Sequence, residues 1–143
     1  MTVKAILAAK GSEVSTINPT ANLATAAKLL AEQRIGALVV TGPDRRVIGI
    51  VSERDIVKKL AAHGSAALEL PLTEVMTRNF INCSASDTIS SIMDQMTQGR
   101  SRHLPVIEQG KLIGIVSIGD VVKSRLEAMG REQLALRDYI QTA

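Results

Sequence analysis

Two copies of a Ser-x-x-Asp pattern are the residues of this sequence best suited to chemistry. Ser52 is followed by Asp55 and Ser117 by Asp120, and each pair comes where an apolar, strand-like run gives way to a helical pattern. One interpretation is an N-terminal capping box, in which Ser and Asp bond to free backbone N–H groups and contribute about 0.5–2 kcal/mol. The other is a nucleotide site, in which the carboxylate accepts both ribose hydroxyls while Ser and the helix N-terminus face a phosphate.

Other reactive side chains are sparse. The two histidines, His63 and His103, lie forty positions apart and Cys83 is the only cysteine, so we predict neither a metal site nor a disulfide. Cys83 stands in a strand-like stretch and is interpreted as a small buried apolar residue, and His63 as the C-terminal residue of a helix. The sequence has no Gly-x-x-x-x-Gly-Lys phosphate loop, no Gly-x-Gly-x-x-Gly after a strand and no His-Glu-x-x-His. We therefore predict no catalytic residue and a protein that is not an enzyme.

Composition narrows the classes of partner. The 143 residues are 45% hydrophobic and 22% charged, as in one ordinary globular domain, but only 1% are aromatic, namely Phe80 and Tyr139. Two separate rings cannot form the platforms on which single-stranded nucleic acids stack their bases. The net charge is +3, but the 17 basic residues are interleaved with 14 acidic ones, as on a solvated surface. Nucleic-acid binding therefore stays an alternative that we do not favour.

No stretch of the chain has the length of a targeting or membrane segment. The first apolar run, Ala5–Ala9, is interrupted by Lys10 and is too short for a signal peptide. A membrane-spanning helix needs about 18 consecutive apolar residues, and no such run occurs. We expect a cytoplasmic protein without a membrane partner.

The chain contains a tandem duplication. The segment Gly49–Lys58 recurs 65 positions later as Gly114–Lys123, with seven of ten residues identical. Upstream, Val14–Val40 matches Phe80–Val106 at an offset of 66, because one intervening loop is a residue longer than the other. The positions that could do chemistry are therefore carried by two equivalent units.

Each unit has the pattern of a β-α-β-β-α fold. A short strand is predicted at Val14–Asn18 and again at Phe80–Ser84, and each is followed by apolar residues at helical spacing. Ala37–Val40 and Val47–Val51 then predict two strands joined by a hairpin, before a second helix begins near Ser52. We predict an α/β (α+β) fold in which two such units pack about a pseudo-twofold axis, because neither can bury both sheet faces alone.

Helices are predicted outside the repeats as well. Short ones are expected at Val3–Ala9 and Leu72–Met76, and a long one at Val121–Ile140, which Gly130 should break or bend. The apolar stripe of the long helix could pack on its own domain or on a second subunit. The predicted organisation is an N-terminal helix at 1–13, a first repeat at 14–63, a linker and helix at 64–79, a second repeat at 80–125 and a C-terminal helix at 126–143.

The duplicated unit, with Gly-Ile-Val-Ser-x-x-Asp in each copy, resembles the cystathionine-β-synthase (CBS) domain. The resemblance covers residues 14–125, and the chain is similar to a stand-alone tandem CBS pair of bacterial type. It implies a regulatory sensor that binds an adenine nucleotide in clefts between the repeats: AMP first, with ADP, ATP, NAD(H) or S-adenosylmethionine as further adenosyl ligands. It also implies a homodimer formed through the flanking helices and an unknown client protein. The alternative is a ligand-free structural or dimerisation module in which both Ser-x-x-Asp patterns act only as caps.

The resemblance implies a main cleft around Asp120. Asp120 would hold the ribose, and Arg102 with His103 would hold a phosphate, to which the forked Arg donors are suited. Since aromatic residues are scarce, the adenine is expected between aliphatic and glycine positions. The residues assigned to this cleft are Lys10, Ser15, Thr16, Ile35, Gly36, Ala37, Arg102, His103, Ser117, Ile118 and Asp120.

A second cleft is implied around Asp55. It departs from the family pattern, because Gly36 and Ala37 stand where the other repeat has Arg102 and His103, and because Glu53 adds negative charge. We expect two inequivalent clefts, the main one suited to AMP and the second weaker or filled by a larger ligand such as NAD(H). The residues assigned to the second cleft are Ser52, Arg54, Asp55, Met76, Ile81 and Ser101.

Overall fold

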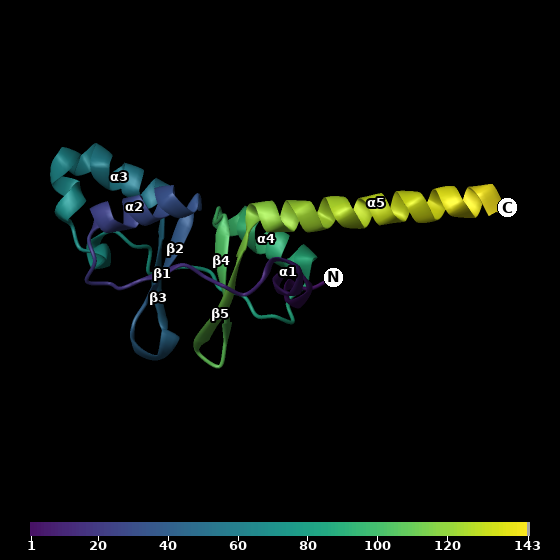
Figure 1. Cartoon of the computed structure of the whole chain (residues 1–143), viewed down its shortest axis with the longest axis horizontal. Coiled ribbons are helices and arrows are strands. Elements are labelled where there is room, and N and C mark those ends of the chain that lie inside the picture. Colours follow the sequence, from purple (N-terminus) through teal and green to yellow (C-terminus); the bar gives the residue numbers. More distant parts are fainter. Residues whose placement is uncertain (143) are drawn as a thin grey trace.

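The chain forms two mixed α/β units that lie side by side, with a long helix extending away from them (Figure 1). The structure is a computed structural model and describes residues 1–142. The helices and strands are α1 (Val3–Lys10), β1 (Thr16–Ile17), α2 (Leu23–Gln33), β2 (Ala37–Thr41), β3 (Val47–Ser52), α3 (Glu53–His63), α4 (Ile89–Gly99), β4 (His103–Glu108), β5 (Lys111–Ser117) and α5 (Ile118–Thr142). Three short 3-10 turns are η1 (Pro43–Arg45), η2 (Gly64–Glu69) and η3 (Leu72–Glu74). The predicted mixed α/β class is confirmed.

The two units differ in their sheets. In the first, β1 pairs in parallel with β2, which pairs antiparallel with β3, whereas the second has only the antiparallel pair β4 and β5. The strand predicted at Phe80–Ser84 is wrong except at Cys83, which forms an isolated parallel bridge with Val106. In the first unit the Val39 N–H donates to the Ser15 carbonyl at 3.2 Å, but the equivalent residue of the second unit is Pro105, which has no N–H, so the pairing cannot extend toward Phe80. The chain before Cys83 is left to line a cleft.

Side-chain caps set where the helices begin. Asn22 Oδ1 accepts a hydrogen bond of 2.9 Å from the Thr25 N–H at the start of α2, and Thr88 Oγ1 accepts one of 3.1 Å from Ser91 at the start of α4. The last residue of α3 is His63, as predicted. Beyond the caps, the apolar faces of α2 and α4 are buried in the cores of the two units.

Each unit has its own hydrophobic core, and each core is completed by a segment outside its repeat. The first core contains Leu38 and Leu72, which lies in η3 after the repeat has ended. The second contains Leu104 together with Val3 and Ile6 of α1, which precede the first repeat in the chain. The chain therefore passes out of the second unit, builds the first and returns, so that the two units are linked by topology.

The flanking helices depart from the predictions in two places. The predicted helix Leu72–Met76 is only the turn η3, because the Thr77 N–H leaves the helical path to bond to the Ile50 carbonyl at 2.8 Å. The predicted break at Gly130 is wrong, since α5 continues through it to Thr142. One glycine costs a helix about 1 kcal/mol relative to alanine, which the good helix formers on both sides can offset. The predicted boundary between residues 125 and 126 consequently lies inside α5.

Candidate functional site

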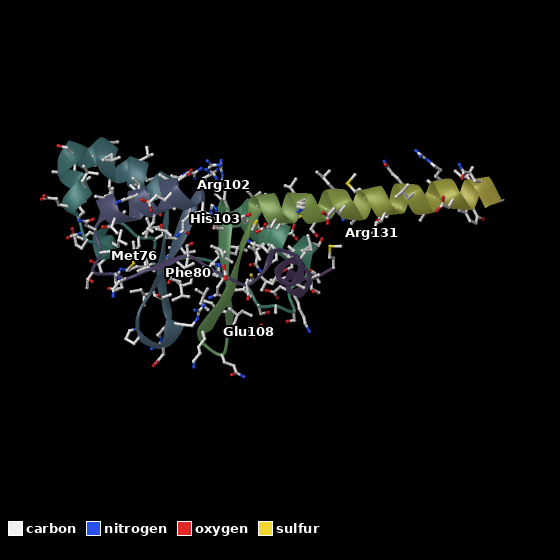
Figure 2. All side chains as sticks on the ribbon, viewed as in Figure 1. Met76, Phe80, Arg102, His103, Glu108 and Arg131 are labelled. Carbon is white, nitrogen blue, oxygen red and sulfur yellow. The ribbon has the colours of Figure 1, made fainter. Side chains whose placement is uncertain are left out.

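An open cleft of about 370 Å³ lies between the two units. We call it the Asp55 cleft, because Asp55 at the start of α3 supplies a carboxylate to it. In Figure 2, Arg102 and His103 lie at the upper end of β4, on the side that faces the first unit. The lining residues are Gly36, Ile50, Ser52, Glu53, Arg54, Asp55, Lys58, Thr77, Asn79, Phe80, Ile81, Gly99, Arg100, Ser101, Arg102 and His103.

Both carboxylate oxygens of Asp55 are held in place by its neighbours. Oδ2 accepts hydrogen bonds from the Ser52 N–H at 2.9 Å and from Ser52 Oγ at 3.0 Å, which completes a capping box on α3. Oδ1 accepts one hydrogen bond, of 3.0 Å, from Thr77 Oγ1. A carboxylate oxygen has two lone pairs, so Oδ1 keeps capacity for a further donor on the cleft side. The cap and an acceptor for a ligand hydroxyl are therefore compatible in one residue.

The charge of the Asp55 cleft is predominantly positive. Four cations line it, Arg54 and Lys58 from α3, Arg100 and Arg102 from the segment before β4, against the carboxylates of Glu53 and Asp55. Arg54 and Lys58 stand one helical turn apart, so both side chains lie on the same side of α3. Guanidinium and ammonium groups gathered from two units favour a polyanionic ligand over a neutral one.

In the second unit, the carboxylate equivalent to Asp55 is that of Asp120, and it already forms an ion pair with a lysine of the same chain. Lys10 Nζ, at the end of α1, lies 2.7 Å from Asp120 Oδ2 and donates a hydrogen bond of 3.0 Å to the Ile115 carbonyl. The Ser117 N–H donates to the same carboxylate at 2.9 Å. Burial raises the pKa of Asp120, but these hydrogen bonds and the charge of Lys10 more than compensate, so its pKa lies below the ordinary value. A ligand hydroxyl at Asp120 would have to share this carboxylate with Lys10.

Replacing Lys10 by Met should raise the pKa of Asp120 and lower the stability at neutral pH by up to about 1 kcal/mol, as expected for a partly exposed ion pair. Because the pKa of Asp120 is depressed in the folded state, the pair stabilises the protein above the ordinary Asp pKa of about 3.9, and this contribution is lost as the pH falls below it. NMR titration of the carboxyl carbon and urea unfolding at several pH values measure the two effects.

Lys28→Met is the matched control for this prediction. Lys28 Nζ lies 4.0 Å from Glu32 in an exposed pair on α2, so its loss should change the stability very little. An Asp120 pKa that is unchanged by Lys10→Met, or a stability loss that persists in acid, would contradict the role given to Lys10.

The structure divides the residues assigned to the main cleft among several places. Lys10, Ser117 and Asp120 lie together, and Ile118 follows them with 41% of its surface exposed. Arg102, His103 and Gly36 line the Asp55 cleft. His103 also stands opposite Ser117 in the pairing of β4 with β5, and it is near enough to Asp120 for that carboxylate to oppose the lowering of its pKa. The His103 ring packs against Gly36, where a Cβ atom would lie 3.2 Å from its Cε1. Because the first repeat has glycine at position 36, the His103 ring of the second repeat can pack closely there. This contact accompanies the position of Arg102 and His103 on the wall of the Asp55 cleft.

The remaining predicted residues are dispersed. Ser15 bonds to Gln33 in a separate shallow hollow, while Thr16 is exposed on β1. Ile35 is partly buried and packs against the first core, Ala37 is buried, and neither lines the Asp55 cleft. Of the six residues assigned to the second cleft, five line it: Ser52, Arg54, Asp55, Ile81 and Ser101.

Met76 is the exception in that set. It is 8% exposed and belongs to the first core, where a Cβ atom on Gly49 would lie 2.6 Å from its Sδ. In Figure 2 it lies away from Arg102 and His103. The chain around Met76 is drawn into the core by the pairing of Thr77 with Ile50, and Thr77 rather than Met76 reaches Asp55.

Burial shifts the pKa values of two other side chains that could react, His103 and Cys83. Desolvation lowers the pKa of His103; the carboxylates of Glu53 and Asp120 oppose the shift, and the charges of Arg102 and Lys10 add to it. Burial, with the nearby carboxylates of Asp87 and Glu108, raises the pKa of Cys83 to about 12. The interpretation of Cys83 as a buried apolar residue rather than a nucleophile is confirmed.

Several residues that line the Asp55 cleft were not predicted from the sequence. Phe80 was assigned to a strand, yet it is the aromatic ring on the wall of the Asp55 cleft, so a base in this cleft would not be restricted to aliphatic neighbours. Lys58 could have been found from its spacing of four from Arg54. Thr77 carried no local signal, since it reaches Asp55 through its pairing with Ile50, and neither did Arg100, whose place in the cleft depends on how the units meet.

Among residues 1–142, no three or more His, Cys, Asp or Glu side chains gather as metal ligands would. In the same part of the chain, no helix combines the length and the apolar character needed to cross a membrane.

Comparison with known proteins gives the family of this chain. The sequence profile of the CBS domain matches residues 3–62 and again residues 72–127. The chain belongs to the CBS-domain family. The match includes α1 and the turn η3, the segments that complete the two cores. A pair of CBS domains is a regulatory module, and the predicted resemblance is confirmed.

Relatives of this CBS pair are found among sequences and solved structures. An uncharacterised 17.7 kDa protein of Acidianus ambivalens is 35% identical over 127 residues, 85% of this chain and 76% of its own. The CBS-domain protein ATU1752 of Agrobacterium tumefaciens has a TM-score of 0.85 and 46% identity, with 87% and 99% of the two chains covered. The CBS pair of protein MJ0100, in complex with 5′-methylthioadenosine and S-adenosyl-L-methionine, has a TM-score of 0.77 and 27% identity over 88% and 98%. The chain spans 58% or less of the Arabidopsis thaliana relatives that it also matches.

Proposed function

We propose that this CBS pair is a non-catalytic cytoplasmic sensor that binds an adenine nucleotide in the Asp55 cleft, AMP first, with ADP, ATP or NAD(H) as larger alternatives. The observation that carries the proposal is that two carboxylates and four cations, drawn from both units, line a single open cleft. The adenosine-containing ligands of the MJ0100 pair support the ligand class. The proposal moves the principal site from Asp120 to Asp55, because Lys10 occupies the Asp120 carboxylate.

Each part of the nucleotide finds a chemically suited partner in the cleft. The ribose hydroxyls would donate to Asp55 Oδ1, which has unused acceptor capacity beside Thr77. The purine would lie against Phe80 and Ile81, and the phosphate near Arg102, where a forked guanidinium can bind it with two hydrogen bonds. The ligand would thereby bridge the first unit, through Asp55, to the second.

Bridging gives a means of regulation. A ligand that contacts both units favours the arrangement in which the cleft is closed, by the difference in its affinity for the open and closed states. Asp55 lies in the first turn of α3, and His103, on the cleft wall, begins β4, which pairs with β5 directly before α5. We propose that a change at the cleft reaches a client protein or a second copy through these helices, and that two copies associate through the flanking helices.

The second candidate is a structural or dimerisation module without a ligand. The observation in its favour is that both Ser-x-x-Asp patterns do form caps, with the Asp N–H donating to Ser Oγ at 3.3 Å in the first unit and 3.2 Å in the second. The two candidates differ in one measurable respect, since only a ligand-binding module is stabilised by a nucleotide.

A thermal melt with and without AMP tests the proposal. A ligand that binds only the folded state at about 100 times its Kd stabilises by about 2.7 kcal/mol. For a domain of this size the Tm should rise by about 5–10 °C. Adenosine is the control for the phosphate, and inorganic phosphate is the control for the base. If AMP, ADP, ATP and NAD(H) at millimolar concentration all leave the Tm unchanged, the structural module is the better description.

A further inference from the structure

The projecting part of α5 exposes apolar side chains that do not pack against either unit. Val121 and Ser124 are 0% and 7% exposed and pack on the second unit, which anchors the start of the helix. Beyond them α5 leaves the body, and Arg131 marks the projecting part in Figure 2. Leu126 and Leu136 there are 62% and 60% exposed. In proteins, most of the stability of a helix comes from packing an apolar face against other elements, and the projecting part of α5 has no such partner in its own chain.

The exposed side chains follow a heptad pattern. Residues spaced alternately by four and three form a single seam along α5, and five of the six are apolar. Such spacing is typical of a two-stranded coiled coil. The seam lies roughly 130° around the helix from Val121 and Ser124, at 3.6 residues per turn, so a second helix could lie along it without displacing the body. The seam consists of Val122, Leu126, Met129, Gln133, Leu136 and Ile140.

We propose that α5 pairs with α5 of a second copy as a parallel, in-register coiled coil along this seam. Charge decides the direction. In a parallel pair, Glu132 lies opposite Arg137 of the partner subunit. Because the pair is twofold symmetric, this attractive contact occurs two times. In the antiparallel pair with the same overlap, Glu132 would face Glu132 of the partner subunit and Lys123 would face the partner's Arg137. Both of those contacts are repulsive.

The polar seam residue favours the same arrangement. In the parallel pair Gln133 meets Gln133 of the partner subunit, and two amides can donate to and accept from one another. In the antiparallel pair it would face Met129 of the partner subunit and lose that hydrogen bond. A single buried polar pair within an apolar seam specifies register and the number of strands in coiled coils.

The inference deepens the proposed association of two copies by naming its surface, and it is independent of the nucleotide. The CBS-domain match ends at residue 127, so most of the seam lies beyond the family's own fold. The seam is a feature of this chain rather than of the repeat.

Leu136→Glu and Leu134→Glu form a matched pair that tests the seam. The two leucines are 60% and 58% exposed on the same helix, but only Leu136 lies in the seam. Sedimentation equilibrium of the full chain should give a dimer for the wild type and for Leu134→Glu, and a monomer for Leu136→Glu with an unchanged Tm of the body. A dimeric Leu136→Glu protein would overturn the coiled coil while leaving association intact, and a monomeric wild type would overturn both.

A cysteine at position 136 tests the direction. In the parallel pair the two Leu136→Cys side chains are adjacent, and mild oxidation should give a disulfide-linked dimer. In the antiparallel pair they are ten residues apart along the axis, about 15 Å, which no disulfide spans. Leu134→Cys is the control and should not cross-link efficiently, and Cys83 is buried and does not interfere. Failure of Leu136→Cys to cross-link, or equal cross-linking of Leu134→Cys, would overturn the parallel register.

Discussion

Replacing Asp55 by Asn should weaken AMP binding by about 10- to 150-fold, measured by isothermal titration calorimetry. Hydrogen bonds to a charged partner contribute about 1.5–3 kcal/mol, which is that factor in Kd. Asn keeps one carbonyl oxygen, so it can still accept from the Ser52 N–H that now donates to Oδ2. The amide removes the charge and puts an NH₂ donor where a ribose hydroxyl would donate. The loss should therefore fall on the ligand and not on the fold.

Asp120→Asn is the control matched to Asp55→Asn. It lies in the same Ser-x-x-Asp pattern of the other repeat and makes the same cap, but its carboxylate is held by Lys10. Its AMP affinity should remain close to that of the wild type. If Asp120→Asn loses the affinity and Asp55→Asn keeps it, AMP binds at Asp120 and displaces Lys10. If both variants lose Tm equally with and without AMP, the two residues serve only as caps.

Leu38→Ala and Leu104→Ala should each lower the free energy of unfolding by about 2–5 kcal/mol, the range for a fully buried leucine. The two residues occupy equivalent places 66 positions apart, and each is 0% exposed in the core of its own unit. Both variants should still unfold in one transition. Val3 and Ile6, at the start of the chain, belong to the core of the second unit, so that core cannot form from the second repeat alone.

Urea unfolding followed by far-UV circular dichroism measures both effects. Leu134→Ala removes a leucine that is 58% exposed and should change the stability by less than about 0.5 kcal/mol. Two separate transitions, with Leu38→Ala moving one and Leu104→Ala the other, would mean that the two units unfold independently despite their topology.

Local sequence patterns correctly predicted those elements of the fold that are determined by interactions between residues close together in the chain. The duplication, the two Ser-x-x-Asp caps, the hairpins and the end of α3 at His63 all follow from spacing, capping and burial of neighbouring side chains. The strand expected at Phe80–Ser84 failed because its partner strand carries Pro105 where the first unit has Val39, and proline has no N–H to donate to the Ile81 carbonyl. The loss of one ladder hydrogen bond outweighed a pattern of apolar residues.

Local sequence patterns could not predict which of the site residues come together in one cleft. Arg102 and His103 were assigned to Asp120, and His103 does stand opposite Ser117, but both residues also line the Asp55 cleft, where the His103 ring packs against Gly36 of the other unit. Phe80 reaches the cleft only because its segment does not pair as a strand. The repeated pattern of residues was enough to predict that two equivalent units each carry a capped carboxylate. Only the tertiary structure made the two carboxylates different, because the ion pair of Lys10 with Asp120 joins residues 110 positions apart, and such a contact depends on how whole elements pack.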